Sequence, residues 1–351
     1  MNSSLAHGKG RSSLSAASNR QRPQRMLWIY LGLLLTALTV AAASGALPIP
    51  IISSLLGQSS LTELQSTVLL QIRLPRVVIA AVVGAALAVT GAALQGLFRN
   101  PLAEPQLIGV SGGAALGAVG MIVLTDKFNI PAILAPYSLP LAAFAGAAAV
   151  TSLLYWFASR RGNQGPAVLL LVGIAINALT AVGIGVFTYL SDDGQLRTLT
   201  FWTLGSFGSS SWEKALPVVI IIGVSTALLL TAARRLDLLQ LGESQARYAG
   251  VDVLRLKRLV VFSGAAAVGA GVAVAGIIGF VGLVVPHLVR LIGGVKHGYL
   301  LPGSALFGAT LTVIADLGAR TLVIPAELPV GLITSAIGAP FFLWLILRVR
   351  R

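Results

Sequence analysis

The sequence contains no cysteine in its 351 residues, and only 10% of its residues are charged. Without cysteine, the chain can form neither a disulfide framework nor a thiolate metal site. A soluble domain carries about a quarter charged residues, so this chain has too few charges to cover a surface that faces water. Hydrophobic residues make up 56% of the sequence, and the mean hydropathy is +0.88. The composition therefore predicts a protein that is surrounded mainly by lipid.

Signatures of energy conversion and catalysis are also missing. No GxxxxGK[ST] loop is present, which excludes ATP binding of that type by this chain. No HExxH pattern or Cys/His cluster indicates a metal site, and His7, His287 and His297 are dispersed. Transporters coupled to protons or Na⁺ usually carry carboxylates in mid-membrane. Here Asp316 is the one candidate, and Arg320 at i+4 predicts a local ion pair instead. The chain is predicted to be a passage, not an enzyme, powered by another subunit.

The formal net charge of +14 does not indicate nucleic-acid binding. The basic residues lie in short gaps between apolar runs, which is the distribution of cytoplasmic loops in membrane proteins. Residues 1–25 are polar, Ser-rich and basic, and we expect a disordered cytoplasmic tail there. Residues 26–351 are predicted to form a single transmembrane domain, which begins with the apolar run 26–47. Its AAASGA at 41–46 resembles a signal-peptide cleavage site, but the run has the length of a membrane span.

The apolar runs predict an all-α integral membrane protein with ten transmembrane helices. The run 259–289 is uncharged and too long for one upright helix, so we divide it at Gly276 and Gly279. With this division the basic tail and the basic C-terminal end both lie in the cytoplasm, as an even number of spans requires. The ten predicted spans are 26–47, 77–97, 107–124, 133–157, 166–190, 215–233, 259–276, 279–292, 300–323 and 329–347.

Small residues recur at the spacing of helix-packing faces in two of the apolar runs. One row comprises Gly84, Ala88, Ala92 and Gly96, and a second comprises Gly271, Ala275 and Gly279. Such rows allow helix backbones to approach closely in lipid. Glycine and alanine are also simply abundant in this chain, but either reading predicts packed helices.

Several long motifs occur in a fixed order along the chain. They are RLPR at 73–76, GAALAVTGAALQGLFRNPLAEPQLIGVSGGAALG at 84–117, LGESQARYAGV at 241–251, GFVGLVVPHLVRL at 279–291 and ELPVGLITSAIGAPFFLW at 327–344. Over residues 65–351 the chain resembles the FecCD family, the permeases of ABC importers for iron-siderophores, haem and cobalamin. The resemblance implies ten helices per subunit, a homodimer of twenty, two cytoplasmic ATPases and a periplasmic binding protein. It also implies the bacterial inner membrane, with both termini cytoplasmic.

Three arginines are predicted to lie on the outer side, against the general distribution of charge. They are Arg73, Arg76 and Arg320, and exposed outer arginines are suited to pairing with carboxylates of a partner. The resemblance implies that they dock the binding protein. Snorkelling to lipid phosphates is the alternative.

The longest internal polar segment, about 234–258, is the predicted contact with the ATPase. The resemblance implies that it forms coupling helices, for which small residues at turns are suited. The coupling residues are Leu241, Gly242, Glu243, Ala246 and Gly250. The alternative is a solvated basic loop.

The remaining site predictions concern the path. By resemblance the turn RRGNQGPA at 160–167 is a cytoplasmic gate with Asn163 and Gln164 at its tip. Arg197, Phe201 and Trp202 could line the mouth of the path, although the aromatics are equally typical of an interfacial belt.

The segment 191–212 resembles the haem branch, which favours haem as cargo over ferric siderophore and, third, cobalamin. His287 is assigned a structural role in preference to haem ligation. The chain itself is expected to hold no cofactor, because ATP acts at the partner ATPase and haem is the transported substrate.

Overall fold

The computed structural model describes residues 9–45, 47–55, 57, 60–127, 130–160, 166–323 and 326–349. Within these ranges every regular element is a helix, and none is a strand. The long helices are α1 (Lys9–Ala43), α4 (Leu74–Phe98), α5 (Val110–Leu124), α6 (Ala135–Arg160), α7 (Pro166–Leu190), α9 (Trp212–Thr231), α12 (Val253–Ala275), α13 (Val281–Gly293), α14 (His297–Thr321) and α15 (Val330–Val349). Shorter elements are α2 (Ile51–Leu55), α3 (Glu63–Thr67), a π-helical segment (Val68–Arg73), 3₁₀ turns (Pro105–Ile108, Thr125–Lys127), α8 (Asp193–Thr203), α10 (Ala233–Leu239) and α11 (Glu243–Tyr248).

The prediction of an all-helical, multi-span membrane protein is confirmed. Among the described residues, seven helices are long and apolar enough to cross a bilayer. Three shorter apolar helices, Val110–Leu124, Val281–Gly293 and Val330–Trp344, lie in the remaining three predicted spans. Whether these three shorter helices also cross the membrane decides the total, so ten transmembrane helices stays a prediction.

The predicted division of the long uncharged run is present. Helix α12 ends at Ala275, and α13 begins only at Val281. Gly276 has a φ of +69°, where a side chain would be strained, and a Cβ there would collide with the carbonyl oxygen of Trp202. Phe280, the residue before α13, has a φ of +66°. The break is thus set by backbone conformation as well as by length.

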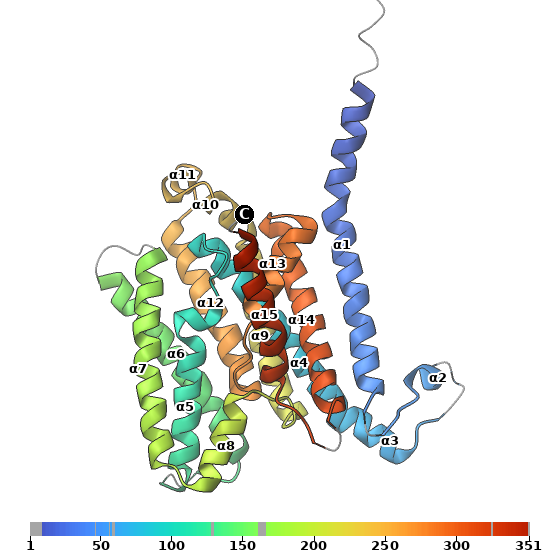
Figure 1. Ribbon diagram of the computed structural model, residues 1–351, viewed down its shortest axis with the longest axis vertical. Helices are drawn as coiled ribbons and strands as arrows, with labels where there is room; N and C mark the ends of the chain where they lie inside the picture. The colour runs from blue at the N-terminus through green and yellow to red at the C-terminus, as the bar shows by residue number, and fades with distance from the viewer. Residues whose placement is uncertain are drawn as a thin grey trace, which may run out of the picture.

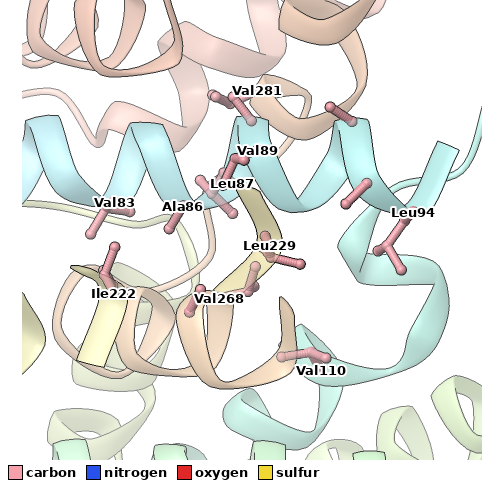
Figure 2. Close-up of a cluster of buried hydrophobic side chains, with 14 of the residues drawn as sticks. Val83, Ala86, Leu87, Val89, Leu94, Val110, Ile222, Leu229, Val268 and Val281 are labelled. Carbon is pink, nitrogen blue, oxygen red and sulfur yellow. The ribbon is translucent and has the colours of Figure 1, made fainter. Parts of the chain in front are cut away.

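Helix α4 lies at the centre of the bundle and is buried along most of its length. It packs against α14, α12, α13 and α9. Figure 2 shows Val83 of α4 beside Ile222 of α9, with Val268 of α12 on the same side of α4. A Cβ added at Gly84 would collide with the carbonyl oxygen of Gly308 on α14. The small residues of α4 therefore bring two helix backbones together, as predicted.

Helix α1 stands at one side of the bundle and packs mainly against α14 (Figure 1). Residues 9–25 belong to this helix, and residues 1–8 lie outside the described residues, so the disordered cytoplasmic tail stays a prediction. The polarity of the segment indicated disorder. However, a polar sequence that continues an apolar helix needs no new nucleation event, so the helix can extend beyond the apolar run.

The bundle has two distinct ends (Figure 1). Helices α10 and α11 lie at one end, where α1 begins and α15 finishes. Helices α3 and α8 lie at the other end, together with the end of α1. We call these the α11 end and the α8 end. The two long terminal helices thus reach the same end of the bundle, which agrees with the even number of spans that the charges predict.

Candidate functional site

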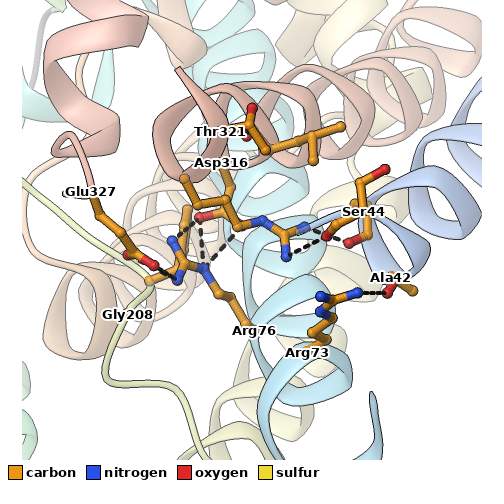
Figure 3. Close-up of polar contacts among 12 residues, drawn as sticks. Ala42, Ser44, Arg73, Arg76, Gly208, Asp316, Thr321 and Glu327 are labelled. Carbon is orange, nitrogen blue, oxygen red and sulfur yellow. Dashed lines mark hydrogen bonds and ion pairs between the residues drawn. The ribbon is translucent and has the colours of Figure 1, made fainter. Parts of the chain in front are cut away.

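A cluster of five charged residues lies at the α8 end (Figure 3). We call this the arginine cluster: Arg73, Arg76, Asp316, Arg320 and Glu327. Arg73 ends the π-helical segment and Arg76 lies in the first turn of α4, while Asp316 and Arg320 lie one turn apart on α14. The cluster therefore joins the second half of the chain to the first.

Arg76 is the centre of the cluster because its guanidinium contacts two carboxylates. Its Nε donates to both oxygens of Asp316 at 3.0 and 3.1 Å, and its Nη2 lies 2.9 Å from Asp316 Oδ1. Its Nη1 donates to both oxygens of Glu327 at 3.0 and 2.9 Å. Asp316 is 1% exposed, whereas the side chain of Glu327 is 47% exposed. Arg76 thus neutralises one buried acid and one acid that remains accessible.

The other two arginines hold the C-terminal end of α1. Arg73 Nη1 donates to the carbonyl oxygens of Ala42 and Ala43 at 3.0 and 2.8 Å, and Arg320 donates to those of Ala41 and Ser44. The last carbonyls of a helix lack partners within the helix and carry partial negative charge. Two guanidinium groups from the core therefore cap α1 and fix it against the bundle.

These contacts correct the predicted exposure of the three arginines. Arg73 and Arg76 are 5% and 7% exposed, and the side chain of Arg320 is 7% exposed. The predicted ion pair between Arg320 and Asp316 is present, but at 3.6 Å it is longer than that between Arg76 and Asp316. The sequence could not show that Arg76 would reach an acid 240 residues away. In the single chain, Glu327 is the accessible member of the cluster.

At the α11 end, the predicted coupling residues form a short helix between two glycines. Gly242 precedes α11 and has a φ of +111°, and Gly250 follows it with a φ of +83°. Both angles favour glycine, so each turn is encoded by the residue type. Ala246, on the inner face of α11, is fully buried. Glu243 accepts a hydrogen bond from Lys257 Nζ of α12 at 2.8 Å. Lys257 is itself 3% exposed, so this pair anchors α11 to the bundle.

Apolar and basic side chains on α11 and just before it are exposed in the single chain. Leu241 is 69% exposed, Tyr248 is 88% exposed, and the side chain of Arg247 is 65% exposed. We call these three residues the α11 surface. Sequence reasoning found Leu241 but missed Tyr248 and Arg247, although both lie within the quoted motif. Exposed aromatic and arginine side chains on a polar loop are typical of protein interfaces.

The predicted mouth residues Arg197, Phe201 and Trp202 all lie on α8. The guanidinium of Arg197 stands 5.9 Å from the ring centroid of Phe201, and Phe201 is 55% exposed. Trp202 is half-buried and lines a cavity of about 280 Å³ together with Phe201. The predicted gate residues Asn163 and Gln164 lie outside the described residues. His287 contacts the ring of Phe341, and neither ring nitrogen has a hydrogen-bond partner among the described residues.

A larger cavity of about 540 Å³ at the α11 end was missed by sequence reasoning. Its walls combine cations with amides, including Arg99, Arg290, Lys296, Gln95 and Gln240. Arg290 donates to Gln95 Oε1 at 2.9 Å, and Gln240 donates to the carbonyl oxygen of Gly96 at 2.8 Å. These residues come from four separate segments, so their proximity has no signal in the sequence.

The fold defines a helical membrane protein with several spans, and comparison with known proteins identifies its family. The model of the FecCD transport family matches residues 30–348, and the chain belongs to this family. The hemin transport system permease protein HmuU of Yersinia pestis is 48% identical over 333 residues, covering 95% of this chain and 98% of that protein. The vitamin B12 import system permease protein BtuC of Vibrio parahaemolyticus is 44% identical, covering 82% and 85%.

A solved structure shows the same arrangement of helices. It is described as an inward-facing conformation of a putative metal-chelate type ABC transporter. The TM-score is 0.82 at 33% sequence identity, over 93% of this chain and 99% of that one. The predicted family is therefore confirmed, and the chain is a permease of the ABC importer class.

Proposed function

We propose that this permease carries haem across the bacterial inner membrane, in an importer that partner ATPases drive. The observation that carries the choice of cargo is the 48% identity to a hemin permease over nearly the whole of both chains. The cobalamin permease is 44% identical over a smaller share, so cobalamin and ferric siderophores are the alternative cargoes. The chain holds no cofactor of its own in this proposal, and haem is the substrate.

The working unit that we propose is a homodimer with ten spans in each copy. Helix α7 packs against α5 and α6, and much of its remaining surface is apolar and exposed. Leu171, Leu179 and Val182 are 66%, 69% and 66% exposed. A second copy across such a face would enclose a path between subunits, whereas one copy alone leaves it open to lipid. The seven long apolar helices and three shorter ones supply the ten spans.

The α11 surface is the proposed contact with a cytoplasmic ATPase. Leu241 and Tyr248 present apolar area, and Arg247 adds a cation at the rim. The pair between Glu243 and Lys257 links α11 to α12, so that a movement of α11 would be transmitted to a core helix. With α11 in the cytoplasm, both chain ends are cytoplasmic too. In this arrangement the hydrolysis of ATP belongs to the partner subunit.

The arginine cluster is the proposed contact with a periplasmic binding protein. Because the three arginines are buried, a partner carboxylate would have to approach Arg76 from the side that Glu327 covers. The side chain of Glu327 is 47% exposed, so its carboxylate can be hydrated when a partner carboxylate takes its place on Arg76. Asn163 and Gln164 as a gate, and Arg197, Phe201 and Trp202 as the mouth, remain parts of the proposal.

Uptake in proteoliposomes tests the function. The permease is reconstituted with its ATPase and its binding protein, and ATP-dependent accumulation of haem, cobalamin and a ferric siderophore is compared in parallel. We expect haem to accumulate only when ATP and both partners are present. Accumulation of cobalamin or siderophore but not haem would assign the other cargo. Haem uptake without an ATPase, driven by a proton gradient, would contradict the importer mechanism and indicate a secondary transporter.

A further inference from the structure

Helices α6 and α9 leave a groove between them on the side of the bundle. Both pack against α12, but within the described residues they make almost no contact with each other. Two cavities of about 280 and 220 Å³ lie in this space. Pro140, Lys214, Ala273 and Val274 line both cavities, so the two form one continuous groove. We call it the α6–α9 groove; its floor is α12, and its walls are α6 and α9. Helix α8 and the segment that follows it also line the cavity nearer the α8 end.

The chemistry of the α6–α9 groove changes along its length. Towards the α8 end its lining combines the hydroxyl groups of Thr198, Ser206 and Ser209 with apolar side chains. Farther along α12 its lining is hydrocarbon, with Phe144, Val218 and others. A molecule that fills both halves must therefore have one polar end and one long apolar part.

Lys214 lies where the two halves meet. Its Nζ donates to the carbonyl oxygen of Ser209 at 3.0 Å, and no carboxylate forms an ion pair with it among the described residues. The side chain is half-buried, and a partly buried cation without a counter-ion favours an anionic ligand. Trp212, two residues earlier, is 42% exposed at the start of α9, a position typical of the membrane interface. Lys214 therefore lies at the depth of lipid headgroups.

The apolar half of the groove is accessible from the side of the bundle. Leu141 lines it and is 58% exposed, and Leu216 and Ile220 on α9 are 64% and 56% exposed. In a membrane protein such side chains face acyl chains. Lipid can therefore enter the groove laterally, without passing through either polar end of the protein.

We propose that the α6–α9 groove binds one anionic phospholipid of the leaflet on the α8 side. Lys214 contacts the phosphodiester, the hydroxyls of Thr198 and Ser209 border the headgroup, and one acyl chain lies along Ala270 and Ala273 of α12. A cation at the headgroup and small residues beneath the chain are the features that such a ligand requires. The bound lipid would fill the space that separates α6 from α9.

Native mass spectrometry of the full chain in detergent tests this proposal, with phosphatidylglycerol as the probe. Lys214→Ala removes the charged hydrogen bond and is expected to weaken binding about tenfold or more. Ala273→Leu places extra side-chain volume on the floor of both halves and should weaken binding while Lys214 is intact. Lys127→Ala is the matched control, because Lys127 is an exposed lysine outside the groove. Melting in lipid-free detergent verifies that each variant is folded.

Three outcomes would overturn the proposal. The first is that phosphatidylglycerol binds folded Lys214→Ala and Ala273→Leu as well as it binds the wild type. The second is that inorganic phosphate alone competes fully with the lipid, which would indicate an ion site without an acyl chain. The third is that haem displaces the lipid one for one, because Phe201 and Trp202 also line the polar half, and the groove would then belong to the cargo. The first two results do not depend on whether haem is the transported substrate.

Discussion

Replacing Arg76 by methionine should be among the most damaging single changes at the α8 end. The substitution keeps much of the side-chain volume but removes five close contacts to Asp316 and Glu327. Asp316 is 1% exposed and would retain only Arg320, whose Nε lies 3.6 Å away. Removal of one partner from a buried pair costs about 3–5 kcal/mol, because the other charge stays buried. Glu327 can turn to solvent, so its lost pair adds only about 0–1 kcal/mol.

Unfolding of the purified chain in mixed micelles, followed by tryptophan fluorescence, measures this loss. Arg76→Lys should be intermediate, because an ammonium group keeps the charge but cannot bridge two carboxylates as a guanidinium does. Combining Arg76→Met with Asp316→Leu should cost less than the sum of the single changes, since both members of the buried pair are then gone. Glu327→Gln is the control and should change the free energy of unfolding by no more than about 1 kcal/mol.

A free energy of unfolding for Arg76→Met within about 1 kcal/mol of the wild type would contradict this prediction. Additive effects of the single and double variants would also contradict it, because residues in direct contact should show coupling. Either result would mean that the ion pair between Arg76 and Asp316 contributes little to the fold. Contact with the binding protein would then be the remaining role for these arginines.

Three further predictions follow from the described contacts. Arg320→Ala should loosen the end of α1, so that amide hydrogen exchange at residues 41–45 becomes faster while exchange in α7 is unchanged. The same exchange rates in the variant and the wild type would show that Arg73 alone is a sufficient cap. Gly242→Val should uncouple ATP hydrolysis from uptake, because Gly242 has a φ of +111° that valine cannot easily adopt. The control Gly223→Val, at a helical glycine with open space around it, should leave coupling unchanged. Normal coupling in Gly242→Val would count against the α11 surface as the ATPase contact. Burial raises the pKa of Glu104, in the loop after α4, above its usual value near 4.3. The free energy of unfolding should therefore fall as the pH rises from the usual pKa to the raised one, and then level off. Glu104→Gln should flatten the dependence of the melting temperature on pH, and an unchanged slope would contradict this.

The sequence alone determined the class of the protein, the course of its helices and its family. Long uncharged runs of apolar side chains are stable in the interior of a bilayer. A run there must be helical, because a helix pairs its own backbone N–H and C=O groups. The break near Gly276 could be predicted because glycine and span length are local properties of the chain. The turns around α11 could be predicted for the same reason, since Gly242 and Gly250 supply conformations that other residues avoid.

The tertiary structure alone decided the long-range contacts of the charged residues. Arg76 pairs with an acid 240 positions away, and Arg73 caps a helix that ends 30 positions earlier. Position in the sequence indicated that these arginines lie at the outer end, but the packing of α1 and α14 buried them. The α6–α9 groove likewise exists only because two helices share α12 as a neighbour without meeting each other. Helix formation depends on nearby residues, whereas burial and ion pairing depend on which distant segments pack together.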